Sequence, residues 1–207
     1  MKTIEFGSAA DTVLIQPVDN HDLAGMENEI SLLRSMTARP FQLIAVKVDN
    51  WNHDLSPWNA PSVFGNGDFG DGAANLLEQI IEYCSSPDKT YYLGGYSLAG
   101  LFALWAACRT DRFAGAAAVS PSVWFPDFSA YLHANPIRTH SVYLSLGDRE
   151  EHTRHPVMAK VGDCIREDYL HLQEQGVNTI LEWNKGGHFT EPDQRIAKGF
   201  AWVMQQT

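Results

Sequence analysis

The hydrophobic positions along the chain follow two alternating patterns, one typical of strands and one typical of helices. Short apolar runs predict strands buried on both faces, and apolar residues three or four positions apart predict amphipathic helices. The runs predict strands at residues 2–6, 12–18, 41–48, 91–96, 113–119, 141–146 and 179–183. The helical spacing predicts helices at residues 26–37, 73–84, 98–105, 157–172 and 192–204. Strands that alternate with helices in this way predict an α/β fold, with a mostly parallel sheet covered on both faces.

Two segments break this pattern and contain many of the aromatic residues. Residues 49–72 are rich in Asn, Gly, Pro and Trp and predict a long loop. About twenty residues separate the strand at 113–119 from the next one, too few for a separate lid domain. Aromatic side chains in such segments either line a pocket or pack the loops onto the protein. Both interpretations apply to Trp51, Trp58, Phe64, Phe69, Trp124 and Phe125.

A single serine stands at the junction between the predicted strand at 91–96 and the helix that follows it. The run Gly-Gly-Tyr-Ser-Leu-Ala-Gly places Ser97 at the apex of a sharp turn. This strand, turn and helix match the nucleophile elbow, G-x-S-x-G, in which small residues let the backbone pass close to neighbouring strands. Ala99 stands where the second glycine usually is. The motif alone also fits an ordinary turn serine.

A histidine and a group of carboxylates also follow predicted strands. His188 follows the strand at 179–183, and the run Gly-Asp-Arg-Glu-Glu follows the strand ending at Leu146. The carboxyl ends of parallel strands meet at one edge of a sheet, where ligands bind. Nucleophile, acid and histidine in this chain order are typical of α/β hydrolases. We therefore expect a triad of Ser97, His188 and one acid, which is Asp148, Glu150 or Glu151.

Each member of such a triad has a defined chemical role. A neutral His188 imidazole would take the proton of the Ser97 hydroxyl during attack on a carbonyl and return it to the leaving group. The carboxylate would fix the imidazole tautomer and stabilise the imidazolium. The developing oxyanion needs N–H donors. We expect one from the backbone of Leu98, and the other from Asn20 or His21 after the strand at 12–18.

Composition and charge limit the classes of protein to which this chain can belong. A chain of 207 residues with 44% hydrophobic content predicts one domain spanning residues 1–207. The formal net charge of −10 argues against nucleic acid or an anionic membrane as a partner. The N-terminus lacks the basic and apolar segments of a signal peptide, and no apolar run reaches the length of a membrane span. We therefore expect a cytoplasmic protein.

The cysteines and histidines outside the expected triad do not predict a cofactor site. Cys84, Cys108 and Cys164 are widely spaced and fall in helical patterns, so they are interpreted as reduced packing residues. His152 and His155 have the spacing of a metal pair, but a solvated loop is favoured because no further ligand cluster completes a site. We expect neither a metal nor a cofactor.

The chain resembles the esterase branch of the α/β hydrolases that includes enterochelin esterases, feruloyl esterases and S-formylglutathione hydrolases. The resemblance is based on residues 95–101, on Ser-Pro-Ser-Val-Trp-Phe at 120–125, similar to the family's S-P-S-L-W-W, and on residues 186–188. Members often carry G-x-x-E or G-x-x-D with the acid in the triad. Residues 147–150, Gly-Asp-Arg-Glu, match this pattern, so the resemblance implies that Glu150 is the acid of the triad. The H-G or D-G pair that follows the first core strand in relatives is replaced here by Asp19-Asn20.

These observations predict a serine hydrolase that cleaves a small acyl or aryl ester, carboxylic or thio, through an acyl-enzyme on Ser97. The same triad could serve an acyltransferase or a peptidase, and a non-catalytic binding protein on a hydrolase scaffold is the alternative. The expected partner is a small-molecule ester, and an edge strand could pair two subunits in a homo-oligomer. The residues expected to line the substrate pocket are Trp51, Trp58, Tyr96, Trp124 and Phe125.

Overall fold

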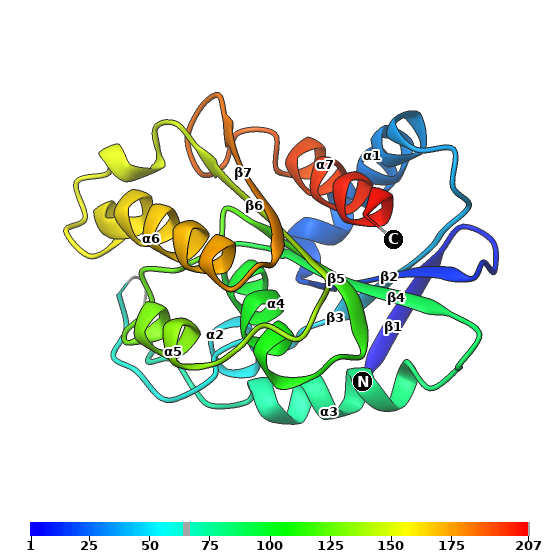
Figure 1. Cartoon of the computed structure of the whole chain (residues 1–207), viewed down its shortest axis with the longest axis horizontal. Coiled ribbons are helices and arrows are strands. Elements are labelled where there is room, and N and C mark those ends of the chain that lie inside the picture. The colour runs from blue at the N-terminus through cyan, green and yellow to red at the C-terminus, as the bar shows by residue number, and fades with distance from the viewer. Residues whose placement is uncertain (64–66, 207) are drawn as a thin grey trace.

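A seven-stranded sheet forms the centre of the protein, in the strand order β1-β3-β2-β4-β5-β6-β7 (Figure 1). The computed structural model describes residues 1–63 and 67–206. β1 pairs antiparallel with β3, and the other neighbouring strands pair in parallel. The predicted fold class is confirmed. The strands are β1 (Lys2–Phe6), β2 (Thr12–Val18), β3 (Gln42–Lys47), β4 (Thr90–Tyr96), β5 (Phe113–Val119), β6 (Ser141–Gly147) and β7 (Asn178–Asn184).

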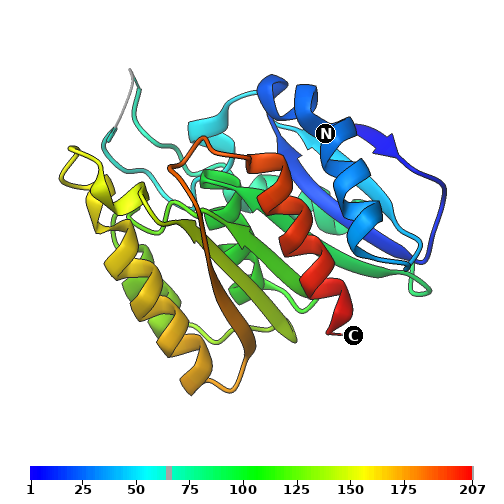
Figure 2. The same cartoon turned by 90° about the horizontal axis from the view of Figure 1, so that it is seen from above.

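Helices cover both faces of this sheet. α1 (Asn20–Met36) and α7 (Pro192–Gln205) lie side by side on one face, as Figures 1 and 2 show. The other face is covered by α3 (Ala73–Tyr83), α4 (Leu98–Arg109), α5 (Phe128–Ala134) and α6 (Val161–Glu174). Two separate apolar clusters result, one on each face. Across residues 1–63 and 67–206, no helix combines the length and apolar character that a membrane crossing needs.

The buried strands and α4 explain why the sequence folds in this way. Every residue of β2 is buried, and successive side chains point to opposite faces, so that Leu14 packs with α1 and α7 while Ile15 packs against the other helices. α4 is buried along nearly its whole length, which its Ala/Leu-rich sequence allows because small and apolar side chains can face other elements on all sides.

The structure differs from the predicted elements in four places. Short helices occur where loops were expected, at α2 (Trp51–Asp54) and α5, because a helix of one or two turns has too few apolar positions to show a period. The helix expected from residue 157 begins with a short 3-10 turn, η2 (Met158–Lys160), before α6. The helix expected from residue 26 begins earlier, at Asn20, where Asp19 caps the start of α1. Phe64 lies outside the described residues.

Candidate active site

Ser97 occupies a strained turn between β4 and α4. Its backbone lies at φ 57° and ψ −120°, a region that residues with a side chain seldom adopt and that is typical of a nucleophile elbow. A Cβ on Gly95 would lie 2.6 Å from the Ala99 Cβ and from its carbonyl. The turn therefore requires glycine at position 95. The Ala99 methyl group fills the adjacent space, which explains how alanine replaces the second glycine of the motif.

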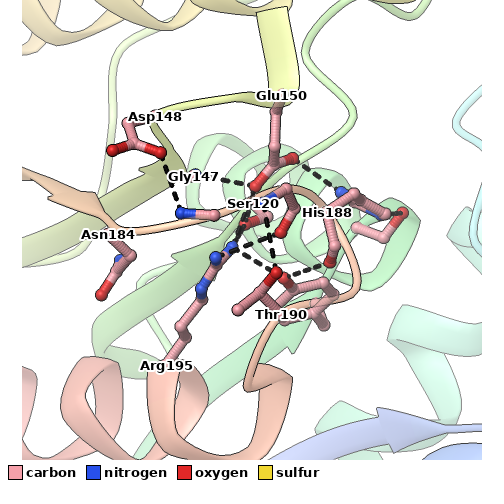
Figure 3. A network of polar contacts seen from close by, with 12 residues as sticks. Ser120, Gly147, Asp148, Glu150, Asn184, His188, Thr190 and Arg195 are labelled. Atoms are coloured by element: carbon pink, nitrogen blue, oxygen red, sulfur yellow. Dashed lines mark hydrogen bonds and ion pairs between the residues drawn. The ribbon is translucent and has the colours of Figure 1, made fainter.

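Ser97, His188 and Glu150 form one hydrogen-bonded chain. His188 Nε2 lies 3.1 Å from Ser97 Oγ, and His188 Nδ1 lies 2.7 Å from Glu150 Oε2. Figure 3 shows the Glu150 carboxylate facing the imidazole of His188. With the proton on Nδ1 donated to Glu150, Nε2 can accept the proton of the serine hydroxyl. The three residues come from the ends of β4, β6 and β7, as the sequence predicts.

The two other candidate acids lie elsewhere. Asp148 is exposed, and its Oδ1 accepts a hydrogen bond from the Gly186 N–H at 2.8 Å. Glu151 forms an ion pair with Arg166, with the closest nitrogen and oxygen 2.8 Å apart. Of the three carboxylates, Glu150 is the one that contacts His188. Asp148 instead supports the loop that leads to the histidine.

Glu150 is buried and held in its ionised form. Its Oε1 accepts hydrogen bonds from the Gly147 N–H at 2.7 Å, the Ser120 hydroxyl at 2.8 Å and Arg195 Nη1 at 3.0 Å. Burial by itself would raise the pKa of this carboxyl. The hydrogen bond and charge of His188, together with the Gly147 and Ser120 hydrogen bonds, outweigh burial and lower the pKa below its ordinary value. The carboxylate can therefore stabilise a protonated imidazole.

Arg195 and Ser120 were not predicted from the sequence. Ser120 adopts φ 43° at the end of β5 and donates to Glu150. Arg195 lies on α7 with only 2% of its surface exposed. Charged residues on amphipathic helices usually face solvent, and nothing in the spacing of α7 distinguishes Arg195 from such a residue. Only the packing of α7 against the strand ends shows that its guanidinium reaches the site.

A cavity of about 620 Å³ opens beside Ser97. Three of the predicted wall residues line it, namely Trp51, Tyr96 and Trp124. An apolar wall that the sequence did not indicate is formed by Met158, Val161, Phe189 and Pro192. The Phe189 side chain, directly after the histidine, is 90% exposed. The cavity therefore offers an apolar surface next to the serine hydroxyl.

The predicted pocket role of Trp58 and Phe125 is corrected. Neither lines this cavity. The Trp58 indole donates a hydrogen bond to the Pro126 carbonyl at 3.1 Å, and its ring packs against Phe125 with centroids 5.8 Å apart. Phe125 is buried and packs edge-on against Phe69 at 5.0 Å. These aromatic residues attach the long loop to the protein, since together they bury more apolar surface than any of them would alone.

Of the expected oxyanion donors, one is engaged elsewhere. The His21 N–H donates to Asp19 Oδ1 at 2.7 Å within the capping box of α1, so the expectation that His21 supplies a donor is corrected. Asn20 is the first residue of α1, and Leu98 is the first residue of α4. The N–H groups of first helical residues have no acceptor within their own helix. The roles of Leu98 and Asn20 as oxyanion donors remain predictions.

Within residues 1–63 and 67–206, no group of three or more His, Cys, Asp or Glu side chains is arranged to hold a metal ion. His152 and His155 lie in this part of the chain. The three cysteines are free, and Cys84 and Cys108 are buried. Burial raises the pKa of both thiols to about 12, so they remain protonated and behave as packing residues.

The arrangement of the chain is that of solved esterase structures. Neither a model of a known protein family nor the sequence of a characterised protein matches this chain. The siderophore hydrolase EstA of Aspergillus nidulans superimposes with a TM-score of 0.71 at 18% identity, over 96% of this chain and 84% of that one. The enterobactin esterase FES of Shigella flexneri gives 0.69 at 15%, over 98% of this chain but 55% of that one.

A third structure has nearly the same length as this chain. Acyl-protein thioesterase 2 of Zea mays superimposes with a TM-score of 0.61 at 16% identity, over 99% of this chain and 98% of that one. At such identities the likeness establishes the fold. The chain therefore has the α/β-hydrolase fold that the resemblance implied.

Proposed function

We propose that the protein is a serine hydrolase that cleaves carboxylic or thio esters through an acyl-enzyme on Ser97. The observation that supports this proposal most strongly is the hydrogen-bonded chain from Ser97 Oγ to His188 Nε2 at 3.1 Å, and from His188 Nδ1 to Glu150 Oε2 at 2.7 Å. The chain of contacts ends in an ionised, buried carboxylate and begins at a serine that lines a cavity. These are the requirements of an activated nucleophile.

In the proposed mechanism, Ser97 Oγ attacks the substrate carbonyl while His188 Nε2 takes its proton. The resulting imidazolium is stabilised by the Glu150 carboxylate. The negative charge on the carbonyl oxygen is stabilised by the Leu98 N–H at the start of α4, where the helix dipole is also favourable. His188 then gives its proton to the leaving alcohol or thiol. A water molecule, activated by His188 in the same way, releases the acyl group.

The cavity favours an ester with an apolar acyl or aryl group. Trp51, Trp124, Met158 and Phe189 provide apolar surface on its walls, and burying such surface contributes roughly 25 cal/mol per Å². The structural neighbours named above hydrolyse a siderophore, enterobactin and acyl-protein thioesters according to their names. Those names support ester or thioester chemistry for this chain.

The experiment that tests this proposal compares two serine variants. Ser122 Oγ lies 3.3 Å from Ser97 Oγ and lines the same cavity, so Ser122→Ala is a matched control. We expect Ser97→Ala to reduce the turnover of p-nitrophenyl esters by about a thousandfold or more without changing the melting temperature. Ser122→Ala should retain most of the turnover. Full activity of Ser97→Ala, or loss of activity only in Ser122→Ala, would contradict the assignment.

A further inference from the structure

Arg195 is a buried cation at the centre of the polar network in Figure 3. Its guanidinium comes from α7, and its Nη1 donates to Glu150 Oε1 at 3.0 Å. In the part of the chain that the structure describes, Glu150 is the carboxylate within ion-pair distance of it. Burying a guanidinium is costly unless it is paired and its donors are satisfied. A buried pair at this position therefore calls for an explanation beyond stability.

The guanidinium also holds the loop that carries His188. Arg195 Nη2 donates to the Lys185 carbonyl at 3.2 Å and to the Gly187 carbonyl at 3.1 Å. These two residues are within three positions of the histidine. Arg195 Nη1 also donates to the Tyr96 hydroxyl at 3.2 Å, and that hydroxyl donates to the His188 carbonyl at 2.7 Å. The guanidinium thus joins the acid directly to the backbone that precedes the base, and through the Tyr96 hydroxyl to the carbonyl of the base itself.

The charge of Arg195 acts on the acid as well. His188 contacts one oxygen of Glu150, and Arg195 contacts the other. An unpaired buried carboxylate would attract a proton strongly onto the adjacent imidazole. A protonated His188 could not take the serine proton. The paired positive charge weakens that attraction while leaving the carboxylate able to orient the ring.

We propose that Arg195 is a positioning residue that fixes the His188 loop to Glu150 and prevents the buried carboxylate from trapping a proton on the histidine. This inference depends on the proposed function, because it assigns a role within the same triad. The charged and titratable groups that contact His188, join the triad network or line the cavity are Glu150, Tyr96, Arg195, Asp19, His21, Asp22 and Arg149. Three more charged groups lie in or against the histidine loop: Asp148 accepts a hydrogen bond from the Gly186 N–H, and Lys185 and Glu191 lie three positions before and after His188.

The test measures the protonation of His188 directly, by NMR titration of its imidazole C–H in the whole protein, together with ester turnover. Arg195→Met removes both the positive charge and the hydrogen-bond donors of the guanidinium. We expect the titration midpoint of His188 to rise by about one pH unit or more, and kcat to fall by about tenfold to a hundredfold as the loop loses its anchor. Arg195→Lys keeps the positive charge. The His188 midpoint in this variant should therefore stay near the wild-type value, while kcat still falls.

Lys198 provides a matched control on the same helix. It pairs with Glu182 at 2.6 Å and does not contact Glu150, so Lys198→Met removes one positive charge of α7 and should leave both readouts unchanged. An unchanged midpoint in Arg195→Met would overturn the proposal, as would an equal shift in Lys198→Met. If Arg195→Met does not fold, Arg195→Lys decides: wild-type kcat in that variant contradicts the positioning role.

The two readouts separate this proposal from the function on which it depends. The NMR midpoint requires no substrate. If the wild-type protein hydrolyses no ester but the His188 midpoint still shifts in Arg195→Met, the hydrolase function is refuted and the electrostatic role of Arg195 is supported. Normal ester turnover by the wild type, with no shift of the His188 midpoint in Arg195→Met, would support the hydrolase function and refute the electrostatic role of Arg195.

Discussion

Gly147 is packed between the acid, the histidine loop and Arg195. A Cβ added there would lie 2.4 Å from the Gly186 carbonyl oxygen, 2.9 Å from Glu150 Oε1 and 3.0 Å from Arg195 Nη1. Ordinary contact begins near 3.4 Å. Gly147→Ala must therefore displace the Gly186 backbone by about 1 Å, and that backbone leads to His188. A misplacement of this size typically reduces catalysis by about a hundredfold.

The assay for Gly147→Ala is kcat and KM on a short-chain p-nitrophenyl ester, with thermal unfolding as a check on folding. Gly187→Ala is the matched control, because a Cβ there meets no atom within 4 Å and Gly187 is in the same loop. We expect a loss of kcat of about a hundredfold in Gly147→Ala and near-normal kcat in Gly187→Ala. A folded Gly147→Ala with wild-type kcat would refute the view that this close packing positions the histidine.

Three further predictions concern the acid, a second buried carboxylate and the cavity wall. Glu150→Gln should lower kcat/KM by on the order of a hundredfold or more and Asp148→Asn far less; the reverse order would move the acid assignment. Burial raises the pKa of the Asp168 carboxyl from 3.8 to about 7. The contribution of the protonated carboxyl to stability is therefore full below about pH 4 and is lost as pH rises through 7. His133 lies 3.3 Å away, but burial and a neighbouring histidine lower its pKa, so it does not supply a compensating charge at pH 8. Asp168→Asn should therefore raise the free energy of unfolding in urea at pH 8 by up to about 4 kcal/mol, with a smaller gain at pH 5; an equal gain at both pH values would contradict this. Phe189→Ala should raise KM several-fold for long acyl or aryl esters and leave acetate esters and the melting temperature unchanged, and an equal effect on all esters would exclude a role in acyl binding.

The sheet and the ends of its strands could be predicted from local sequence. β5 is a run of seven small or apolar residues, and β2 is apolar except at Thr12 and Gln16; a strand buried on both faces has this pattern. Ser97 was identifiable because it follows the buried strand β4, and His188 because it follows the partly exposed strand β7; each lies beside glycines that permit sharp turns. These signals lie within a few residues of the feature that they predict.

The features that could not be predicted depend on contacts between distant segments. Arg195 lies 45 positions from Glu150 along the chain, and no local pattern relates the two. The spacing of residues also did not distinguish pocket wall from loop packing: Trp51 and Trp124 line the cavity, whereas Trp58 and Phe125 pack against each other. Aromatic residues in both roles have the same local composition.

The capping of α1 is a further example. Asp19 accepts hydrogen bonds from the His21 and Asp22 amides. The sequence Asp-Asn-His-Asp resembles a polar turn, but the acid three positions after Asp19 completes a capping box. This local signal could have moved the predicted start of the helix and excluded His21 as an oxyanion donor.

The most direct test of the central claim is intact-mass analysis after exposure to a fluorophosphonate, which reacts with activated serines. The wild-type protein should gain the mass of a single adduct, and Ser97→Ala should gain none. This result would establish that Ser97 is an activated and accessible nucleophile. A folded wild-type protein that forms no adduct, or an adduct that persists in Ser97→Ala, would contradict the proposal that the contacts of His188 with Ser97 and Glu150 form a catalytic triad.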